Sequence, residues 1–201
     1  VQLAWANGWD WMPAFRRWGV AEQGFWRGWF TLPRVVTEGA DKLPRFQPHP
    51  QLETLRKKAI PWGRKELTAP WTLPDAAETA WEILLEIPAQ QQTGGLLLQV
   101  GNCFALELTL VSRTLHAYVK DTGEQTMQDC GTLQLVPGVP VRLQVFLDRC
   151  SAEIFADGKC LSVNVFDTAP LRPVSLIPQG GTLPLQLLQV WHLQHVMEPQ
   201  T

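Results

Sequence analysis

Asp148 and Glu153 are the residues whose type and spacing come closest to acid–base chemistry in this sequence. Two carboxylates on one strand can act as an acid and a base when their side chains lie side by side. Their spacing of five residues is odd, however, and an odd spacing puts two side chains on opposite faces of an uninterrupted strand. We therefore expect both residues to make structural hydrogen bonds, at a bend or at a domain interface, and to have no catalytic role.

The cysteines and histidines are too scattered to suggest a metal site. They contain no CxxC pair and no Cys/His cluster, which are the usual patterns of zinc ligands. A chain of this size has core enough without disulfides, so we expect free, partly buried thiols and a reducing, cytoplasmic setting. We predict no metal and no cofactor. The residues are Cys103, Cys130, Cys150, Cys160, His49, His116, His192 and His195.

The overall composition argues against two classes of partner. The 201 residues include 17 basic and 19 acidic ones, so the chain has no positive field that would attract nucleic acid or anionic lipid. The longest apolar runs, at 95–100 and 104–111, are far shorter than the roughly 20 residues needed to cross a bilayer. The chain starts like the middle of a strand and without a signal peptide, so we expect an upstream portion.

The first 29 residues differ in composition from the rest, because they contain six of the ten tryptophans. Two strand-like runs, at 1–6 and 26–32, are too few to form a stable domain by themselves. Residues 33–50 are rich in proline, glycine and charge, which is typical of a connector. Residues 51–58 have the apolar spacing of one or two helical turns, which Pro61 would end.

From about residue 79 the apolar residues recur with period two, and no helical segment intervenes. Trp81, Ile83, Leu85 and Ile87 define the first of these strands, with one face turned inward. Asp157-Gly158 is a strong signal for a two-residue hairpin turn, because glycine accepts the positive φ that such a turn requires. Many short strands separated by turns predict an antiparallel β-sandwich. Further strands are expected at 96–100, 104–111, 114–120, 141–147, 151–155, 161–166, 174–177 and 185–193.

Four segments in a fixed order carry a resemblance to a known family. They are LAWANGWDW at 3–11, GFWRGWFTLPR at 24–34, QLETLRKK at 51–58 and FLDRCSAEIFADG at 146–158. They resemble, in turn, the patterns I-G-W-M-x-N-W-D-Y, G-W-R-G-x-M-S-L-P-R-E-L, E-L-x-x-L-R and F-x-D-x-S-x-V-E-x-F-x-N-D-G of glycoside hydrolase family 32, the invertases, inulinases and levanases. Gly8, Val35, Cys150 and Ala152 depart from these patterns, which blurs the subfamily but not the family.

The resemblance implies an all-β fold, in which the end of a five-bladed β-propeller is followed by a C-terminal antiparallel β-sandwich. Residues 1–48 would hold the last-blade strands of the catalytic propeller and a connector. Residues 49–64 would form a linker with a short helix, and residues 65–201 the sandwich. The chain would thus be the C-terminal part of a β-fructofuranosidase, with the upstream propeller polypeptide as its partner.

The family's chemistry is a retaining hydrolysis of β-fructofuranosides such as sucrose, which needs two carboxyl groups about 5 Å apart. The resemblance assigns them to an Asp in W-M-N-D-P-N-G and a Glu in E-C, with a third acid in R-D-P that holds the fructose hydroxyls. None of these motifs occurs in this chain. We therefore expect no catalytic residue here and no activity from the chain alone.

Trp5, Asn7 and Asp10 are the candidate substrate-binding residues, because their family counterparts line the sugar pocket or its rim. An indole face can pack on the apolar face of a sugar ring. The alternatives are that Trp5 belongs to the core of the last blade and that Asp10 caps its own turn. The pair Arg16-Arg17 could meet a substrate phosphate, although a solvated loop is the favoured interpretation.

A different class of function stays open, in which the sandwich is a non-catalytic carbohydrate-binding module. Its candidate aromatic residues are Phe104, Tyr118 and Trp191, which form no obvious planar row. An inert remnant with only a scaffolding role is a third possibility. The sequence does not separate sucrose from sucrose 6-phosphate, inulin or levan as the substrate.

Overall fold

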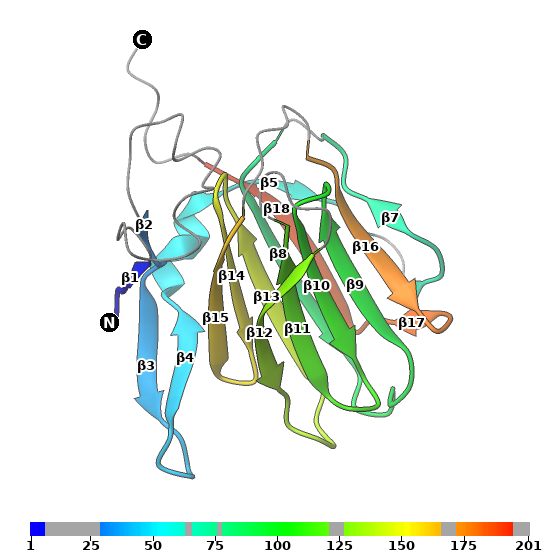
Figure 1. Cartoon of the computed structure of the whole chain (residues 1–201), viewed down its shortest axis with the longest axis horizontal. Coiled ribbons are helices and arrows are strands. Elements are labelled where there is room, and N and C mark those ends of the chain that lie inside the picture. Colours follow the sequence, from blue (N-terminus) through cyan, green and yellow to red (C-terminus); the bar gives the residue numbers. More distant parts are fainter. Residues whose placement is uncertain (7–28, 63–65, 76–77, 121–126, 166–171, 195–201) are drawn as a thin grey trace.

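The computed structural model describes residues 1–6, 29–62, 66–75, 78–120, 127–165 and 172–194. In these residues the fold is all-β, and its main body is a pair of six-stranded sheets that lie one in front of the other (Figure 1). The predicted all-β class and the sandwich-like pair of sheets are thereby confirmed. No helix in the described part is long and apolar enough to span a membrane.

The front sheet in Figure 1 has the strand order β12-β11-β10-β9-β16-β7, and the rear sheet has the order β15-β14-β13-β8-β18-β5. All neighbours in both sheets are antiparallel. The front strands are β7 (Trp71–Thr72), β9 (Gly95–Val100), β10 (Phe104–Thr109), β11 (Thr114–Val119), β12 (Gln128–Gln134) and β16 (Val174–Gln179). The rear strands are β5 (Arg56–Ile60), β8 (Trp81–Ile87), β13 (Val141–Leu147), β14 (Ser151–Ala156), β15 (Lys159–Asn164) and β18 (Leu187–Leu193).

The core lies between the two sheets because alternate side chains of each strand point inward. Leu98 and Leu106 of the front sheet and Ile83, Val145 and Ile154 of the rear sheet are almost completely buried there. Two strands, β8 and β13, have the limits expected from the sequence. The apolar alternation that predicted these strands is therefore also the pattern that closes the sandwich.

The hairpin turn between β14 and β15 is confirmed as well. Ala156 pairs with Lys159, so the turn consists of Asp157 and Gly158 alone. Both residues have a positive φ, 50° and 72°, as a type I′ turn requires.

The structure of residues 49–60 differs from the prediction of a helix over 51–58. A 3₁₀ helix, η2, covers only Pro50–Leu55, and the chain then continues as β5 along the edge of β18. Two interactions favour the strand: Arg56 reaches the buried carboxylate of Glu82, and Ile60 enters the main core. Tertiary contacts thus override the local helical pattern.

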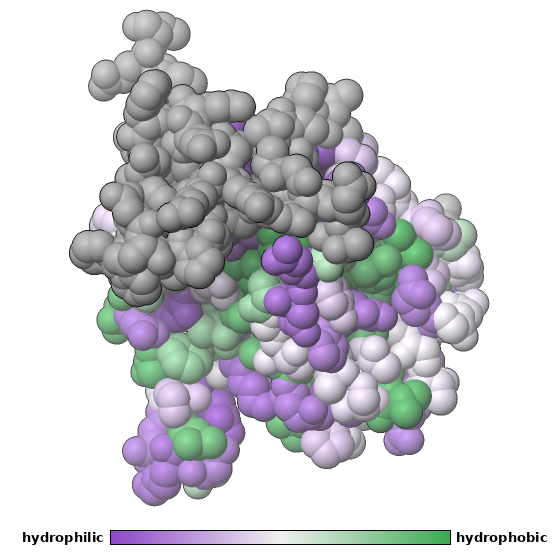
Figure 2. All heavy atoms as spheres, in the orientation of Figure 1, coloured by the Kyte–Doolittle hydropathy of each residue, from purple (hydrophilic) through white to green (hydrophobic). Residues whose placement is uncertain are grey.

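The expected connector at 33–50 contains a hairpin of β3 (Arg34–Glu38) and β4 (Pro44–Pro48). The two prolines of β4 are compatible with a strand, because proline is tolerated in an edge strand, where no partner needs its N–H. The hairpin projects beyond the sheets at the left of Figure 1, and Figure 2 shows that its projecting end is mostly hydrophilic. The remaining short strands are β1 (Trp5–Ala6), β2 (Trp29–Phe30), β6 (Glu66–Leu67) and β17 (Leu183–Pro184).

Strand β8 was expected to bury one face, yet both of its faces are buried. On the second face, Glu82 is bonded by Arg56 and Gln144. Elsewhere on this side of the rear sheet, a smaller apolar cluster joins the sheet to η2, with Leu52 packed near Phe146 and Phe155. The segment before the sandwich therefore packs on the outer face of the rear sheet, and this contact positions the site described below.

We expect Gly95→Ala to lower the free energy of unfolding by about 3 kcal/mol, because overpacking against backbone cannot relax easily. A Cβ at this position would lie 2.0 Å from the carbonyl oxygen of Leu108 in the paired strand β10. Gly138→Ala is the control: no atom lies within 4 Å of its Cβ position, and only its φ of +77° penalises the change, by about 1 kcal/mol. Urea unfolding of both variants measures the difference, and equal losses would contradict the close approach of β9 and β10.

Candidate functional site

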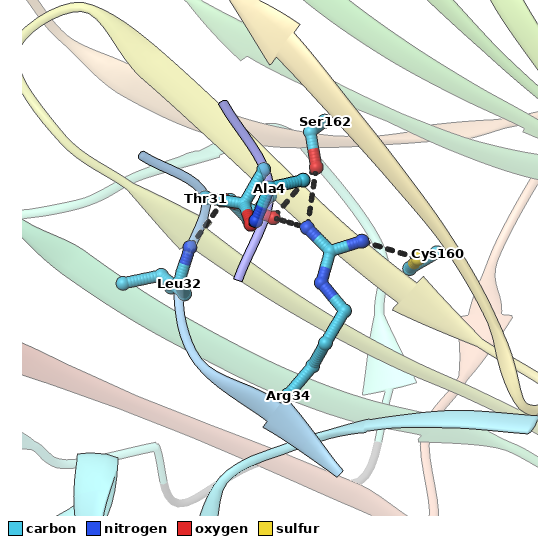
Figure 3. A network of polar contacts seen from close by, with 7 residues as sticks. Ala4, Thr31, Leu32, Arg34, Cys160 and Ser162 are labelled. Atoms are coloured by element: carbon cyan, nitrogen blue, oxygen red, sulfur yellow. Dashed lines mark hydrogen bonds and ion pairs between the residues drawn. The ribbon is translucent and has the colours of Figure 1, made fainter. Parts of the chain in front are cut away.

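A buried ion pair joins the segment before the sandwich to the sandwich itself. Arg34 at the start of β3 donates from Nη2 to Oε2 of Glu153 on β14 over 2.9 Å, although the two residues are 119 positions apart in the chain. Their side chains are only 7% and 2% exposed. Figure 3 shows the guanidinium reaching toward β15, where it donates to Ser162 Oγ and Cys160 Sγ. Burial at this level requires each charge to have a partner, and each has one.

Glu153 also holds the backbone of the amino-terminal segment. Its Oε1 accepts a hydrogen bond of 2.7 Å from the amide of Leu32, and its Oε2 accepts another from Ser162. A carboxylate that accepts from both a backbone amide and a guanidinium fixes the orientation of the chain that carries them. Residues 31–34 are thereby attached to the rear sheet.

The first residues of the chain are attached through that segment. Ala4 and Thr31 exchange two hydrogen bonds of 2.9 and 3.0 Å, and Gln2 and Arg34 form a two-way backbone bridge. Trp29 of β2 adds a direct anchor, because its indole N–H donates to the side chain of Asn164 on β15. The β1–β2 pair is therefore positioned by contacts that lead back to Glu153.

Burial raises the pKa of the Glu153 carboxyl above its ordinary value. The hydrogen bonds from Ser162 and Leu32 and the charge of Arg34 act in the opposite direction. Removing Arg34 would consequently raise this pKa further.

Asp148 has no part in this network. It lies exposed in the turn between β13 and β14, where its carboxylate accepts a hydrogen bond of 2.7 Å from the amide of Arg149. The structure thus gives Asp148 and Glu153 separate, structural partners. Arg34 was not predicted as a site residue, although its place at the end of the segment GFWRGWFTLPR was an available signal.

Trp5 lies on β1 with its indole packed edge to face on Phe30 of β2, at a centroid distance of 5.0 Å. These two side chains remain 55% and 63% exposed, and Val1 and Leu3 beside them are exposed too. Exposed apolar side chains that gather on one short strand pair are typical of an interaction surface. The other two candidate residues, Asn7 and Asp10, lie outside the described residues, as do Arg16 and Arg17.

The aromatic residues considered for a binding module do not share a surface. Phe104 is fully buried in the core, and the Trp191 ring is covered by the guanidinium of Arg56 at 4.0 Å. Tyr118 lies beside His116 on β11 of the opposite sheet. Within the described ranges, no three His, Cys, Asp or Glu residues gather as metal ligands.

Two of the thiols are poor nucleophiles, because desolvation of the sulfur atom raises the pKa of Cys130 and of Cys150 to about 11, even though Cys130 as a residue is exposed. Nearby carboxylates, Asp129 and Asp148 respectively, act in the same direction. Both side chains are consequently protonated at neutral pH.

Comparison with known proteins adds a family and a fold. A family model described as "Glycosyl hydrolases family 32 C terminal" matches residues 51–192. No curated protein sequence matches the chain.

Several solved structures have a similar fold. An exo-inulinase from Aspergillus awamori superposes with a TM-score of 0.70 at 15% identity, over 97% of this chain and 40% of that one. A family 32 β-fructofuranosidase from Bombyx mori superposes with a TM-score of 0.69 at 18% identity, over 96% of this chain and 38% of that one. A sucrose-6-phosphate hydrolase from Lactobacillus gasseri superposes with a TM-score of 0.68 at 14% identity, over 97% of this chain and 38% of that one. The chain therefore spans less than half the length of each of these proteins, and at such identities the likeness concerns the fold alone.

We expect Arg34→Met to destabilise the chain by about 3 kcal/mol at pH 7.5, because Glu153 would keep a buried charge without its cation. A raised carboxyl pKa makes a contribution to stability that is fully present below the unfolded pKa and is lost as the pH rises through the folded pKa. Since the variant raises that folded pKa further, its loss of stability should be smaller at pH 5 than at pH 7.5.

Arg45→Met serves as the control, because Arg45 pairs with the exposed Asp41 at the projecting end of the β3–β4 hairpin. This substitution should change the free energy of unfolding little at either pH. Urea unfolding of both variants at pH 5 and pH 7.5 gives the comparison. A loss at Arg34 that is equal at both pH values, or no larger than that at Arg45, would contradict the role of the buried pair.

Proposed function

The chain belongs to glycosyl hydrolase family 32 as its C-terminal portion, and from this premise we propose that it is part of a β-fructofuranosidase that hydrolyses sucrose or a related β-fructoside. In this proposal β1 and β2 are strands of the last blade of a five-bladed β-propeller. The upstream polypeptide of the same enzyme supplies the other blades and both catalytic carboxylates. Sucrose 6-phosphate and fructans remain within the proposed substrate class.

The observation that supports this proposal best is the β1–β2 strand pair. It exposes Trp5 and Phe30, and Val1 and Leu3 just before β1 are exposed as well, while hydrogen bonds that lead to Glu153 attach the pair firmly to the sandwich. A two-stranded pair buries too little to be stable alone, and an apolar face on it is explained if further strands cover it. The sandwich would then act as a brace that fixes the orientation of the last blade.

The proposed role of Trp5 follows from its exposure and its rigid position against Phe30. Its indole would form one wall of the sugar pocket, and Asn7 and Asp10 would provide hydrogen-bonding groups at the rim. The reaction would be a retaining one, in which an upstream carboxylate attacks the anomeric carbon and a second carboxylic acid protonates the leaving oxygen. The residues of this chain would bind and orient the substrate without taking part in bond cleavage.

A hydrolysis assay tests the proposal. The isolated chain should release no fructose from sucrose, whereas the chain combined with the polypeptide encoded upstream of it should. In the combined enzyme Trp5→Ala should lower kcat/KM about a hundredfold, because a misplacement of about 1 Å can cost that much.

Val111→Ala is the control, because Val111 is also a large apolar residue exposed to solvent, and it follows β10, away from the β1–β2 pair. Its turnover should equal that of the unmodified enzyme. Release of fructose by the isolated chain would overturn the assignment of the chemistry to the upstream part. A Trp5→Ala variant as active as Val111→Ala would remove Trp5 from the sugar pocket.

A further inference from the structure

A pocket of about 410 Å³ lies between the rear sheet and the segment that precedes the sandwich. One wall comes from β4 and η2, and the other from β8, β13 and β14. The amide of Phe46 in β4 donates a hydrogen bond of 2.8 Å to Gly158 in the β14–β15 turn, which holds the two walls together. This chain alone builds the pocket, and its volume lies in the range of small-molecule sites.

The apolar part of the pocket is aromatic. Phe46 stands on the β4 side, and Phe146 and Phe155 stand on the side of the sheet. The last two rings pack edge to face at 6.1 Å, so their positions are fixed by each other. Phe146 and Phe155 are only 5% exposed each, so they form the floor of the pocket, whereas the half-buried ring of Phe46 is the aromatic surface that can pack on the C–H groups of a sugar ring.

The polar part of the pocket contains groups with spare hydrogen-bonding capacity. The buried carboxylate of Glu82 accepts from Arg56 at 2.7 and 2.8 Å and from Nε2 of Gln144 at 2.7 Å. Because Gln144 donates its amide N–H there, its side-chain oxygen remains as an acceptor of fixed orientation. The backbone of Arg142 pairs with Glu86 of β8, but its guanidinium, also in the lining, makes no hydrogen bond or ion pair to any described residue and remains a donor.

The charges of the pocket favour a neutral ligand. Arg56 cancels the charge of Glu82, so the positive charge left in the lining is that of Arg142. The carboxylates of Glu53 and Asp157 also belong to the lining and oppose that charge. An anion such as a phosphate dianion would therefore meet no net positive field.

We propose that this pocket is a saccharide-binding site, which holds a neutral mono- or disaccharide unit between Phe46 and the rear sheet, with Gln144 and Arg142 as its hydrogen-bonding partners. The inference takes its substrate class from the proposed function, but it requires no catalysis. Binding by the isolated chain is therefore a separate outcome from sucrose hydrolysis by the complete enzyme.

Titration of the isolated chain with sucrose, fructose and glucose, followed by calorimetry and by amide chemical shifts, tests the proposal. At least one of these sugars should bind, with shifts concentrated at residues 46–48, 142–146 and 155–158. Phe46→Ala and Arg142→Ala should each weaken binding at least tenfold. Thermal unfolding of each variant shows whether it is folded. If one of them is not, Gln47→Ala, a substitution at another lining residue, takes its place.

Two matched controls separate the pocket from the general surface. Leu43→Ala lies on the same β3–β4 hairpin outside the pocket, and Arg149→Ala removes the exposed arginine just past the other end of β13. Both should bind as the unmodified chain does. The proposal would be overturned if none of the three sugars binds, or if the control variants lose as much sugar affinity as the pocket variants. Tighter binding of inorganic phosphate than of any sugar would overturn it as well.

Discussion

The ion pair between Arg34 and Glu153 determines how the amino-terminal part of this chain is placed. Both side chains are almost completely buried, and a buried charge without a partner is strongly destabilising. The position of Arg34 in the fold is therefore fixed by its need to pair with Glu153. The same carboxylate holds the amide of Leu32, so the direction of the chain as well as its position is defined at this point.

The ion pair joins two parts of the chain that differ in packing, the sandwich and the β1–β2 pair. The sandwich has a continuous apolar core between its sheets and a second cluster beneath η2, so it is a well-packed body. The β1–β2 pair, in contrast, presents Trp5 and Phe30 to solvent while its backbone is fixed to that body. A rigidly held apolar surface is suited to receive further strands, and in the proposed enzyme it transmits the position of the sandwich to the last blade.

Much of the fold was predictable because apolar alternation is a local signal. It gave the limits of β8 and β13, and the Asp157-Gly158 pair gave the β14–β15 turn with its positive φ values. Elements that depend on distant partners were missed. Arg56 extends into a strand because Glu82 and β18 hold it there, and the prolines of β4 are compatible with an edge strand whose pairing the sequence does not reveal.

The same distinction applies to the site. Structural hydrogen bonds were expected of Asp148 at a bend and of Glu153 at an interface, and both residues make such bonds. Nothing near Glu153 in the sequence, however, pointed to a partner 119 positions away. The pocket beneath β4 was likewise beyond prediction, because its walls come from segments about a hundred residues apart. Spatial neighbours of this kind follow from packing and not from spacing.

The central claim is that the surface of β1 and β2 is completed by an upstream polypeptide of the same enzyme. Hydroxyl-radical footprinting of the chain, with and without the polypeptide encoded upstream, measures it directly at Trp5 and Phe30. The account predicts strong protection of both side chains in the complex, while Val111 on the far hairpin keeps its reactivity. Equal reactivity of Trp5 and Phe30 in the two samples would contradict it.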